Sequence, residues 1–466
     1  MSLFSSLSVA LSGLQAATTQ ISLVANNISN ATTEGYTTKT AATASVTLGN
    51  EGGGVRITGY RRATDTALFN ALTDATSDAS YRSAQEDYLQ QVETILDCTD
   101  TSDPALASAM SEFASAWKEL SAQPEDSVLQ QQVIDAASNL VAQISNASSK
   151  IEALDRQITD DINTTITGLN SDLVNIADLN AKISQALMSG QSSSDLEDQR
   201  DTLIQEVAAV MNVTVMERAN GQIALYTPGG YMLVEGTTAR SFTYNGTDVT
   251  TTTNTALSLN DVLTGGSLEA MVDFRADGSP AAASTSGTGE VIRKLRDQLD
   301  LIVEAFTTSS AGPPETFAYA YANATGTAGE ATYIFSGADR FTFEVNAALI
   351  DGSETIKTAS ATAVCETFDV STRTFSADGL NVSNASYESL VTNILSCFQQ
   401  AYSNIRSLSE TASDQKDFLQ ESYANKTGVN VDAETVKLTI LQNSYAASAH
   451  VMAVIQKMFD ILEGLV

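Results

Sequence analysis

The chain has 466 residues and a net charge of −32, because it holds 24 Lys and Arg but 56 Asp and Glu. This length corresponds to about three domains at roughly 150 residues each, and the charge repels phosphate backbones and anionic membrane surfaces. We therefore expect no nucleic-acid partner. Charged residues make up 17% of the chain, below the ~25% of typical soluble domains, so uncharged polar residues must cover much of the surface.

The first thirty residues carry a heptad repeat of apolar side chains. Leu7, Leu14, Ile21 and Ile28 recur every seven residues, a spacing typical of coiled-coil helices. No charged residue precedes Glu34, so the rest of this helix lacks the charges of an ordinary solvated face. The pattern predicts a helix that ends within the Asn-rich segment around Ile28 and is buried on more than one side.

The C-terminal end repeats this pattern. Apolar residues recur there at heptad spacing in two series. The first contains Leu438, Tyr445, Met452 and Phe459, and the second, three positions later, contains Leu441, Ile455 and Leu462. Matching repeats predict that residues 1–40 and 430–466 form one terminal coiled-coil domain. We expect both sets of side chains to form an assembly interface that is buried only when subunits associate. Two helices packed on an ordinary core are the alternative interpretation.

Between the two ends, segments whose apolar residues have helical spacing alternate with segments whose apolar residues have the two-residue spacing of strands. Residues 75–211 have helical spacing, and from Val213 the period changes to two. Helical spacing returns over 291–306, and 317–375 again alternates. The chain is thus predicted to be mainly α with inserted β: terminal coiled-coil helices, a long-helix bundle from both chain halves, and one or two small antiparallel β domains. The bundle would comprise 41–211, 266–310 and 385–429, and the β-rich outer part 212–265 and 311–384.

Residues suited to catalysis or metal binding are sparse. The only histidine, His450, would point away from the heptad face, and the three cysteines are widely spaced. No glycine cluster completes a phosphate-binding motif. Neighbouring Asp160 and Asp161 would diverge by about 100° on a helix and could not share a proton. We expect a non-enzymatic protein with no catalytic residue, no cofactor and no metal.

The sequence also shows no pattern typical of a secretory signal peptide or a membrane-spanning segment. The first cationic residue is Lys39, and Ser and Thr interrupt every apolar stretch, which argues against a secretory signal peptide. No run of about 18 apolar residues occurs, so we expect no membrane insertion.

Four short motifs carry a family resemblance. The first contains Asn26, Asn27, Asn30, Gly35 and Tyr36 in the order Asn-Asn-Ile-Ser-Asn-Ala-Thr-Thr-Glu-Gly-Tyr, and it resembles the N-terminal signature of bacterial flagellar axial proteins of the rod, hook and hook-associated group. The other three narrow this resemblance to the hook-associated proteins of the first hook–filament junction. They are Phe-Ala-Ser-Ala-Trp-Lys-Glu-Leu at 113–120, Asp-Leu-Glu-Asp-Gln-Arg-Asp-Thr-Leu at 195–203 and Gly-Val-Asn-Val-Asp-Ala-Glu at 428–434.

This resemblance implies a structural component of the bacterial flagellum that joins hook to filament and assembles through its terminal helices as a ring of subunits. It implies the hook protein and the second hook–filament junction protein as neighbours, and an export chaperone on the C-terminal helix at 441–462. It also implies an extracellular location, reached by flagellar type III export without a cleaved signal peptide. A hook or distal rod protein is the nearest alternative, and a secreted coiled-coil adhesin is an alternative from another class.

Overall fold

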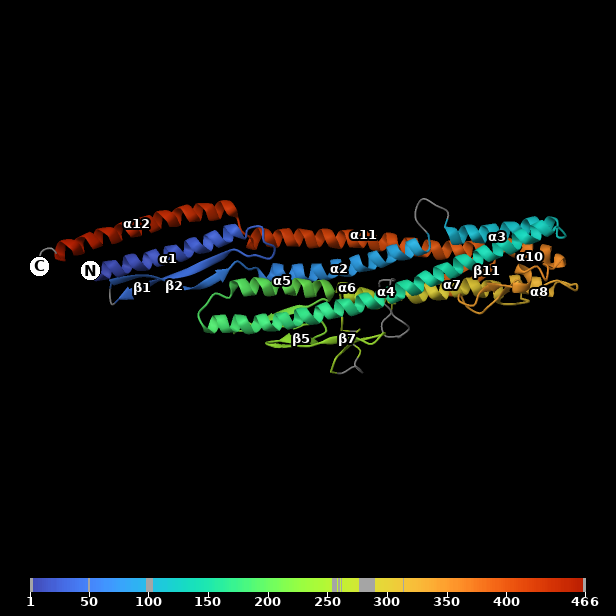
Figure 1. Cartoon of the computed structure of the whole chain (residues 1–466), viewed down its shortest axis with the longest axis horizontal. Helices are drawn as coiled ribbons and strands as arrows, with labels where there is room; N and C mark the ends of the chain where they lie inside the picture. Colours follow the sequence, from blue (N-terminus) through green and yellow to red (C-terminus); the bar gives the residue numbers. More distant parts are fainter. Residues whose placement is uncertain are drawn as a thin grey trace.

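The computed structural model describes residues 3–48, 51–97, 104–253, 258, 260, 262–275, 290–312 and 314–463. Figure 1 shows an elongated molecule in which the two ends of the chain lie at the same end. Helices from both halves of the chain run side by side along it, with small antiparallel sheets attached. The predicted fold class, mainly α with inserted β, is confirmed.

The terminal helices α1 (Leu3–Ser29) and α12 (Val431–Glu463) form an antiparallel pair. The first turn of α1 meets the last turns of α12, where the rings of Phe4 and Phe459 pack edge to face with centroids 5.2 Å apart. The α1 helix ends in the Asn-rich segment, as its sequence predicts. The end falls there because Asn side chains compete for backbone hydrogen bonds.

A hairpin of β1 (Lys39–Leu48) and β2 (Glu51–Arg62) covers the face of α1 that lies away from α12, so that α12, α1 and the hairpin form three layers (Figure 1). Residues 41–62, which were expected in the helical domain, lie in this hairpin and form strands instead of helices. Gly54 permits the contact with α1: its φ is +106°, and a Cβ there would lie 2.2 Å from Ser12 Oγ. That hydroxyl accepts a 3.1 Å hydrogen bond from the Val55 N–H.

The central part of the molecule is a bundle of long helices, which confirms the helical prediction for residues 75–211 and 291–306. Its members are α2 (Thr66–Ile95), α3 (Ala105–Ala122), α4 (Ser127–Met188), α5 (Ser194–Val210), α6 (Gly266–Arg275), α7 (Val291–Thr307) and α11 (Tyr387–Thr427). The α2 and α11 helices, from opposite halves of the chain, pack along each other.

The α4 helix is 62 residues long because its buried face continues without a break. Ile144, Ile151 and Ile158 follow one another at heptad spacing and are fully buried. The Asp126 side chain caps its start by accepting a 2.8 Å bond from the Val128 N–H. Gly168 lies inside the helix, where its cost of about 1 kcal/mol is smaller than the gain from burying such a face.

An aromatic core joins the outer end of the bundle to the segment that follows α7. Phe113 and Trp117 of α3 are fully buried. The Phe113 ring packs at 5.4–6.3 Å from the rings of Trp117, Phe306, Phe317, Phe335 and Phe368. The motif at 113–120 is therefore a packing motif of the bundle.

The β structure predicted after Val213 is present. Strands β3 (Thr214–Glu217), β4 (Ile223–Tyr226), β5 (Met232–Glu235) and β6 (Thr238–Ala239) form one antiparallel sheet in that order, and β7 (Phe242–Tyr244) pairs with β8 (Val249–Thr251). Asn180 of α4 holds the sheet: its amide donates to Ile223 O at 3.0 Å and Gly236 O at 2.8 Å and accepts from the Ile223 N–H.

The predicted strand-rich stretch at 317–375 is mostly wrong. It contains the helices α8 (Phe317–Asn323), α9 (Ala347–Ile350), η1 (Thr358–Ser360) and α10 (Ala361–Asp369), the two-residue strands β9 (Phe335–Ser336) and β10 (Glu344–Val345), and the first strand of the hairpin β11 (Arg373–Ala377) with β12 (Leu380–Ala385). The alternating aromatic residues misled the prediction, because Phe335 and Phe343 stack on each other in the aromatic core instead of extending a sheet.

Candidate assembly interface

The heptad residues of the sequence prediction lie mainly between the two terminal helices of the same chain. On α1, Leu7, Leu14, Ile21 and Ile28 are half-buried. On α12, Leu438, Leu441, Met452 and Phe459 are half-buried, Ile455 is buried and Tyr445 is exposed, while the side chain of Leu462 lies outside the described residues. The expectation that these residues are buried only after assembly is wrong for Ile455, because α1 already covers that face.

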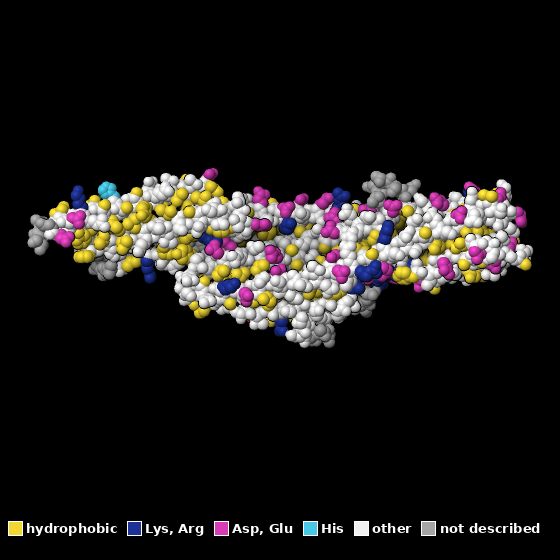
Figure 2. All heavy atoms as spheres, viewed as in Figure 1, with side chains coloured by type: hydrophobic (Ala, Val, Ile, Leu, Met, Phe, Trp, Pro, Cys, Tyr) yellow, Lys and Arg dark blue, Asp and Glu magenta, His cyan; other side chains and the backbone are white. Residues whose placement is uncertain are grey.

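A second apolar stripe on α12 remains open. Its exposed members follow heptad spacing of four and three residues, and we call them the outer stripe: Ala447, Val451, Val454, Met458 and Ile461. Val451, Val454, Met458 and Ile461 are 43–59% exposed, although such side chains are normally covered. Figure 2 shows that hydrophobic atoms are dense over the α1–α12 end and sparse over most of the bundle. The sequence prediction missed this stripe, whose signal is a second heptad register in the same helix.

The exposed face of α1 is uncharged. Phe4 and Leu11 are exposed there at 74% and 47%, among Ser, Thr and Gln side chains. By length and composition alone, residues 4–29 could cross a membrane, with a mean hydropathy of 1.2. In the structure this helix packs on α12 and the hairpin, and 22% of the apolar segment is buried within the chain.

Three of the four family motifs meet where the terminal pair joins the bundle. Asn27 is fully buried, and its amide nitrogen donates to Glu434 Oε2 at 3.0 Å and Lys39 O at 2.9 Å. Its amide oxygen accepts from the Tyr36 hydroxyl at 2.9 Å and the Lys39 N–H at 3.1 Å. Asp198 binds the ammonium group of Lys39 at 3.1 Å. We call Asn27, Tyr36, Lys39, Asp198 and Glu434 the motif cluster.

The cationic side chains at this junction are held by carboxylates of α5. Burial disfavours the charge on Lys39, but Asp195 and Asp198 outweigh it and raise the pKa of the ammonium group. Arg62 of β2 binds Asp201 at 2.6 Å, Glu197 at 2.9 Å and Asp198 at 3.1 Å. Burial again disfavours this charge, yet the three carboxylates raise the pKa of the Arg62 guanidinium. The hairpin is thus ion-paired to the bundle on one side.

The remaining motif residues shape the loop between α1 and β1. Gly35 adopts a φ of +74°, and a Cβ there would lie 2.5 Å from Thr202 Oγ1 on α5, which explains the glycine. Asn30 donates from its side chain to Asn26 O at 3.0 Å and accepts from the Thr33 hydroxyl at 3.3 Å. The Asn26 side chain is exposed. The sequence identifies these residues by their pattern, but the meeting of three motifs required the structure.

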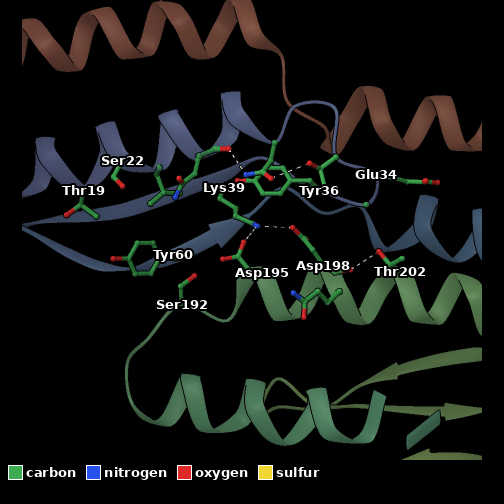
Figure 3. Close-up of a pocket in the computed structure, with 16 residues that line it drawn as sticks. Thr19, Ser22, Glu34, Tyr36, Lys39, Tyr60, Ser192, Asp195, Asp198 and Thr202 are labelled. Atoms are coloured by element: carbon green, nitrogen blue, oxygen red, sulfur yellow. Dashed lines mark hydrogen bonds and ion pairs between the residues drawn. The ribbon is translucent and has the colours of Figure 1, made fainter. Parts of the chain in front are cut away.

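A cleft of about 640 Å³ opens beside the motif cluster (Figure 3). The cleft is lined by Thr19 and Ser22 of α1, Tyr60 of β2 and Asp195 near the start of α5. The ion pair of Lys39 with Asp198 joins β1 to α5 beside these residues. Within the described ranges, no group of three His, Cys, Asp or Glu side chains could hold a metal ion. His450 is exposed on α12.

Comparisons with known proteins find relatives for two segments of the chain. Residues 89–310 match the family described as the helical domain of the flagellar hook-associated protein FlgK, and residues 7–37 match the flagella basal body rod protein family. The first match falls on the helical bundle and the second on α1 and the loop that follows it, so both segments are similar to parts of flagellar axial proteins. The longer match makes residues 89–310 similar to the helical domain of FlgK hook-associated proteins.

Curated relatives match about half of the chain. Flagellar hook-associated protein 1 of Salmonella typhimurium is 32% identical over 238 residues, which are 50% of this chain and 42% of the relative. The protein of the same name in Escherichia coli K12 gives 32% over 238 residues, 43% of its length, and that of Bacillus subtilis 27% over 246 residues, 48% of its length. The matched segments thus cover less than half of each relative.

A solved structure, the flagellar hook junction protein FlgK from Burkholderia pseudomallei, aligns with a TM-score of 0.45 at 19% identity. The alignment covers 57% of this chain and 46% of that one.

Proposed function

We propose that this chain is a structural, non-enzymatic subunit of the bacterial flagellum that joins hook to filament and assembles as a ring through α1 and α12. The observation that carries the proposal is the outer stripe of α12, an exposed heptad row on a helix whose inner face is already paired with α1. Burying an exposed aliphatic side chain of this size contributes about 1.5–3 kcal/mol, so the row gives a strong reason to associate.

The predicted heptad residues support the same proposal in a different role. The half-buried residues Leu7, Leu14, Ile21 and Ile28 lie on α1, which packs along α12, so they help to hold the terminal pair together. The inner residues thereby present the outer stripe on a rigid pair, which lowers the ordering cost of association.

The partners and location follow from this role as further parts of the proposal. The ring neighbours are other copies, the hook protein and the second hook–filament junction protein. An export chaperone binds α12 before assembly, because an exposed apolar helix face suits a hydrophobic groove. The protein acts outside the cell after type III export without a cleaved signal peptide. It takes no cofactor, binds no nucleic acid and does not insert into a membrane.

A hook or distal rod protein is the second candidate, because residues 7–37 match the rod family. The match of residues 89–310 to the hook-associated helical domain favours the junction role. Immunogold labelling of isolated flagella with an antibody against the bundle separates the two. A narrow band between hook and filament supports the junction, whereas label along the hook or rod would contradict it.

A pair of neighbouring substitutions tests the assembly surface. Val454→Asp charges the outer stripe and should abolish labelling at the junction while the purified chain stays folded. Ala453→Asp is the matched control, since Ala453 is exposed on the solvated stripe with His450 and Lys457 and should incorporate normally. Normal incorporation of the Val454 variant would overturn assembly through this stripe.

A further inference from the structure

The β1–β2 hairpin has a charge opposite to that of the rest of the chain. Residues 39–62 contain Lys39, Arg56, Arg61 and Arg62 but one carboxylate, a net charge of +3, so the remainder of the chain carries −35. Such a local reversal in a strongly acidic protein calls for a partner of the opposite sign.

Two of these cations already have partners within the chain. Lys39 and Arg62 are ion-paired to carboxylates of α5 on the side of the hairpin that faces the bundle. Arg56 and Arg61 differ, since both are exposed and the described part of the chain offers them no ion pair. The register shift at Thr58 places Arg56 opposite Ala44 and Arg61 opposite Thr40, so these two exposed cations lie on one face of the hairpin, which we call its outer face. Tyr60 is on the other face, which borders the cleft.

The layer order places this outer face on one side of the molecule and the α12–α11 side opposite to it (Figure 1). On α11, the exposed carboxylates Glu410, Asp414, Asp417 and Glu421 fall at i, i+4, i+7 and i+11, which is one stripe of the helix. Carboxylates gather along the α11 edge in Figure 2. Arg406 and Lys416 pair with Glu410 and Asp417, which leaves Asp414 and Glu421 without an ion pair within the described ranges.

We propose that the outer face of the hairpin, through Arg56 and Arg61, docks against the acidic α11 stripe of a second copy of this chain. The two surfaces are different, so the contact is head-to-tail, and such contacts join identical subunits into a ring when the rotation between neighbours closes. The inference rests on the proposed ring function and adds a salt-sensitive contact outside the apolar contact of α12. The contact fixes the rotational register of neighbours, a task to which uniform apolar stripes contribute little.

Zero-length cross-linking in isolated flagella tests the partner directly. Cells that lack the native protein express the full chain with Arg61→Lys, and a carbodiimide then joins the new amine to any carboxylate in contact. We expect a dimer cross-linked between residue 61 and Asp414 or Glu421, with its intermolecular origin shown by mixing isotope-labelled copies. Cross-links from residue 61 to another protein would overturn the inference.

Charge reversal gives a second, independent reading. Arg56→Glu with Arg61→Glu should reduce the copies at the junction about tenfold, as expected for two exposed charge pairs turned repulsive. Asp414→Lys with Glu421→Lys in the same chain should restore them. The matched control reverses Lys150 and Arg156, which are exposed on α4, and should incorporate normally.

The outcomes separate this inference from the proposed function. If the wild-type chain labels the junction but the hairpin variant incorporates fully, the docking inference fails and the ring function stands. If the wild-type chain is absent from flagella, both fail. Binding of the wild-type chain to anionic vesicles, lost in the hairpin variant while incorporation is unchanged, would assign the hairpin to a lipid surface and overturn the inference.

Discussion

Asn27 at the end of α1 donates a 3.0 Å hydrogen bond to Glu434 in the first turn of α12, across 407 positions of sequence. Both side chains are buried. Because an amide and a carboxylate cost free energy when buried without partners, this contact fixes the distance between the two terminal helices at the end where they leave the bundle.

Asn27→Ala should lower the free energy of unfolding of the terminal pair by about 2–4 kcal/mol. The substitution leaves Glu434, Tyr36 and the backbone of Lys39 without the partner that serves all of them. Limited proteolysis should show faster cleavage within α1 and α12, with the bundle unchanged. Asn26→Ala is the control, because its exposed side chain should be replaceable within about 0.5 kcal/mol. Equal proteolysis of the two variants would contradict the role of the motif cluster.

Gly35→Ala should destabilise the chain more than Gly190→Ala, although both glycines have a φ near +70°. Each substitution has the same left-handed backbone cost of about 1 kcal/mol. A Cβ at position 35 also meets Thr202 Oγ1 at 2.5 Å, whereas position 190 has nothing within 4 Å, so we expect about 1–3 kcal/mol more for Gly35. Denaturant unfolding measures the difference, and adding Thr202→Ala should recover part of it. Identical losses would show that the contact relaxes freely.

Glu269 should make stability fall as pH rises. Burial raises the pKa of this carboxyl from 4.5 to about 7 in the folded chain, against a hydrogen bond from the Gly265 N–H that lowers it. Between these two values the folded state holds a proton that the unfolded state has released, so stability is highest below pH 4.5 and falls until about pH 7. Allowing for partial exposure, the loss is about 1–2 kcal/mol.

Glu269→Gln removes this titration and should equal the wild type at pH 4.5 but exceed it by about 1–2 kcal/mol at pH 8. Urea unfolding at both pH values, followed by the fluorescence of Trp117, checks the difference. The control Glu119→Gln changes an exposed carboxylate on α3 and should show no such gain. A variant that is less stable than wild type at pH 8 would reverse the sign and refute the argument.

Asn180→Ala should detach the β3–β6 sheet from α4. Its amide nitrogen serves two strand carbonyls, and its oxygen serves the Ile223 N–H and the Arg200 guanidinium at 3.1 Å each. Losing these buried contacts should cost about 2–4 kcal/mol and speed amide exchange in β4 and β5. Asn163→Ala, on an exposed position of the same helix, should leave that exchange unchanged. Protected strands in the Asn180 variant would show that apolar packing alone holds the sheet.

Local periodicity in the sequence determined most of the helical framework. Heptad spacing at both ends predicted α1 and α12, and long amphipathic runs predicted α4 and α7, because the side chains that a helix buries recur every three to four residues. The same reasoning failed at 317–375, where Phe335 and Phe343 alternate like strand residues but pack into an aromatic core. It also missed the β1–β2 hairpin.

The tertiary structure alone decided which apolar face remains free and which polar residues meet. Val454 and Ile455 are neighbouring aliphatic residues, yet α1 covers Ile455 and leaves Val454 exposed. Asn27, Asp198 and Glu434 belong to three motifs that are far apart in the chain, and their contacts depend on how α1, α5 and α12 pack. Sequence periodicity predicts which face of a single helix is buried. Contacts between residues of different helices depend on how those helices pack together, which periodicity does not predict.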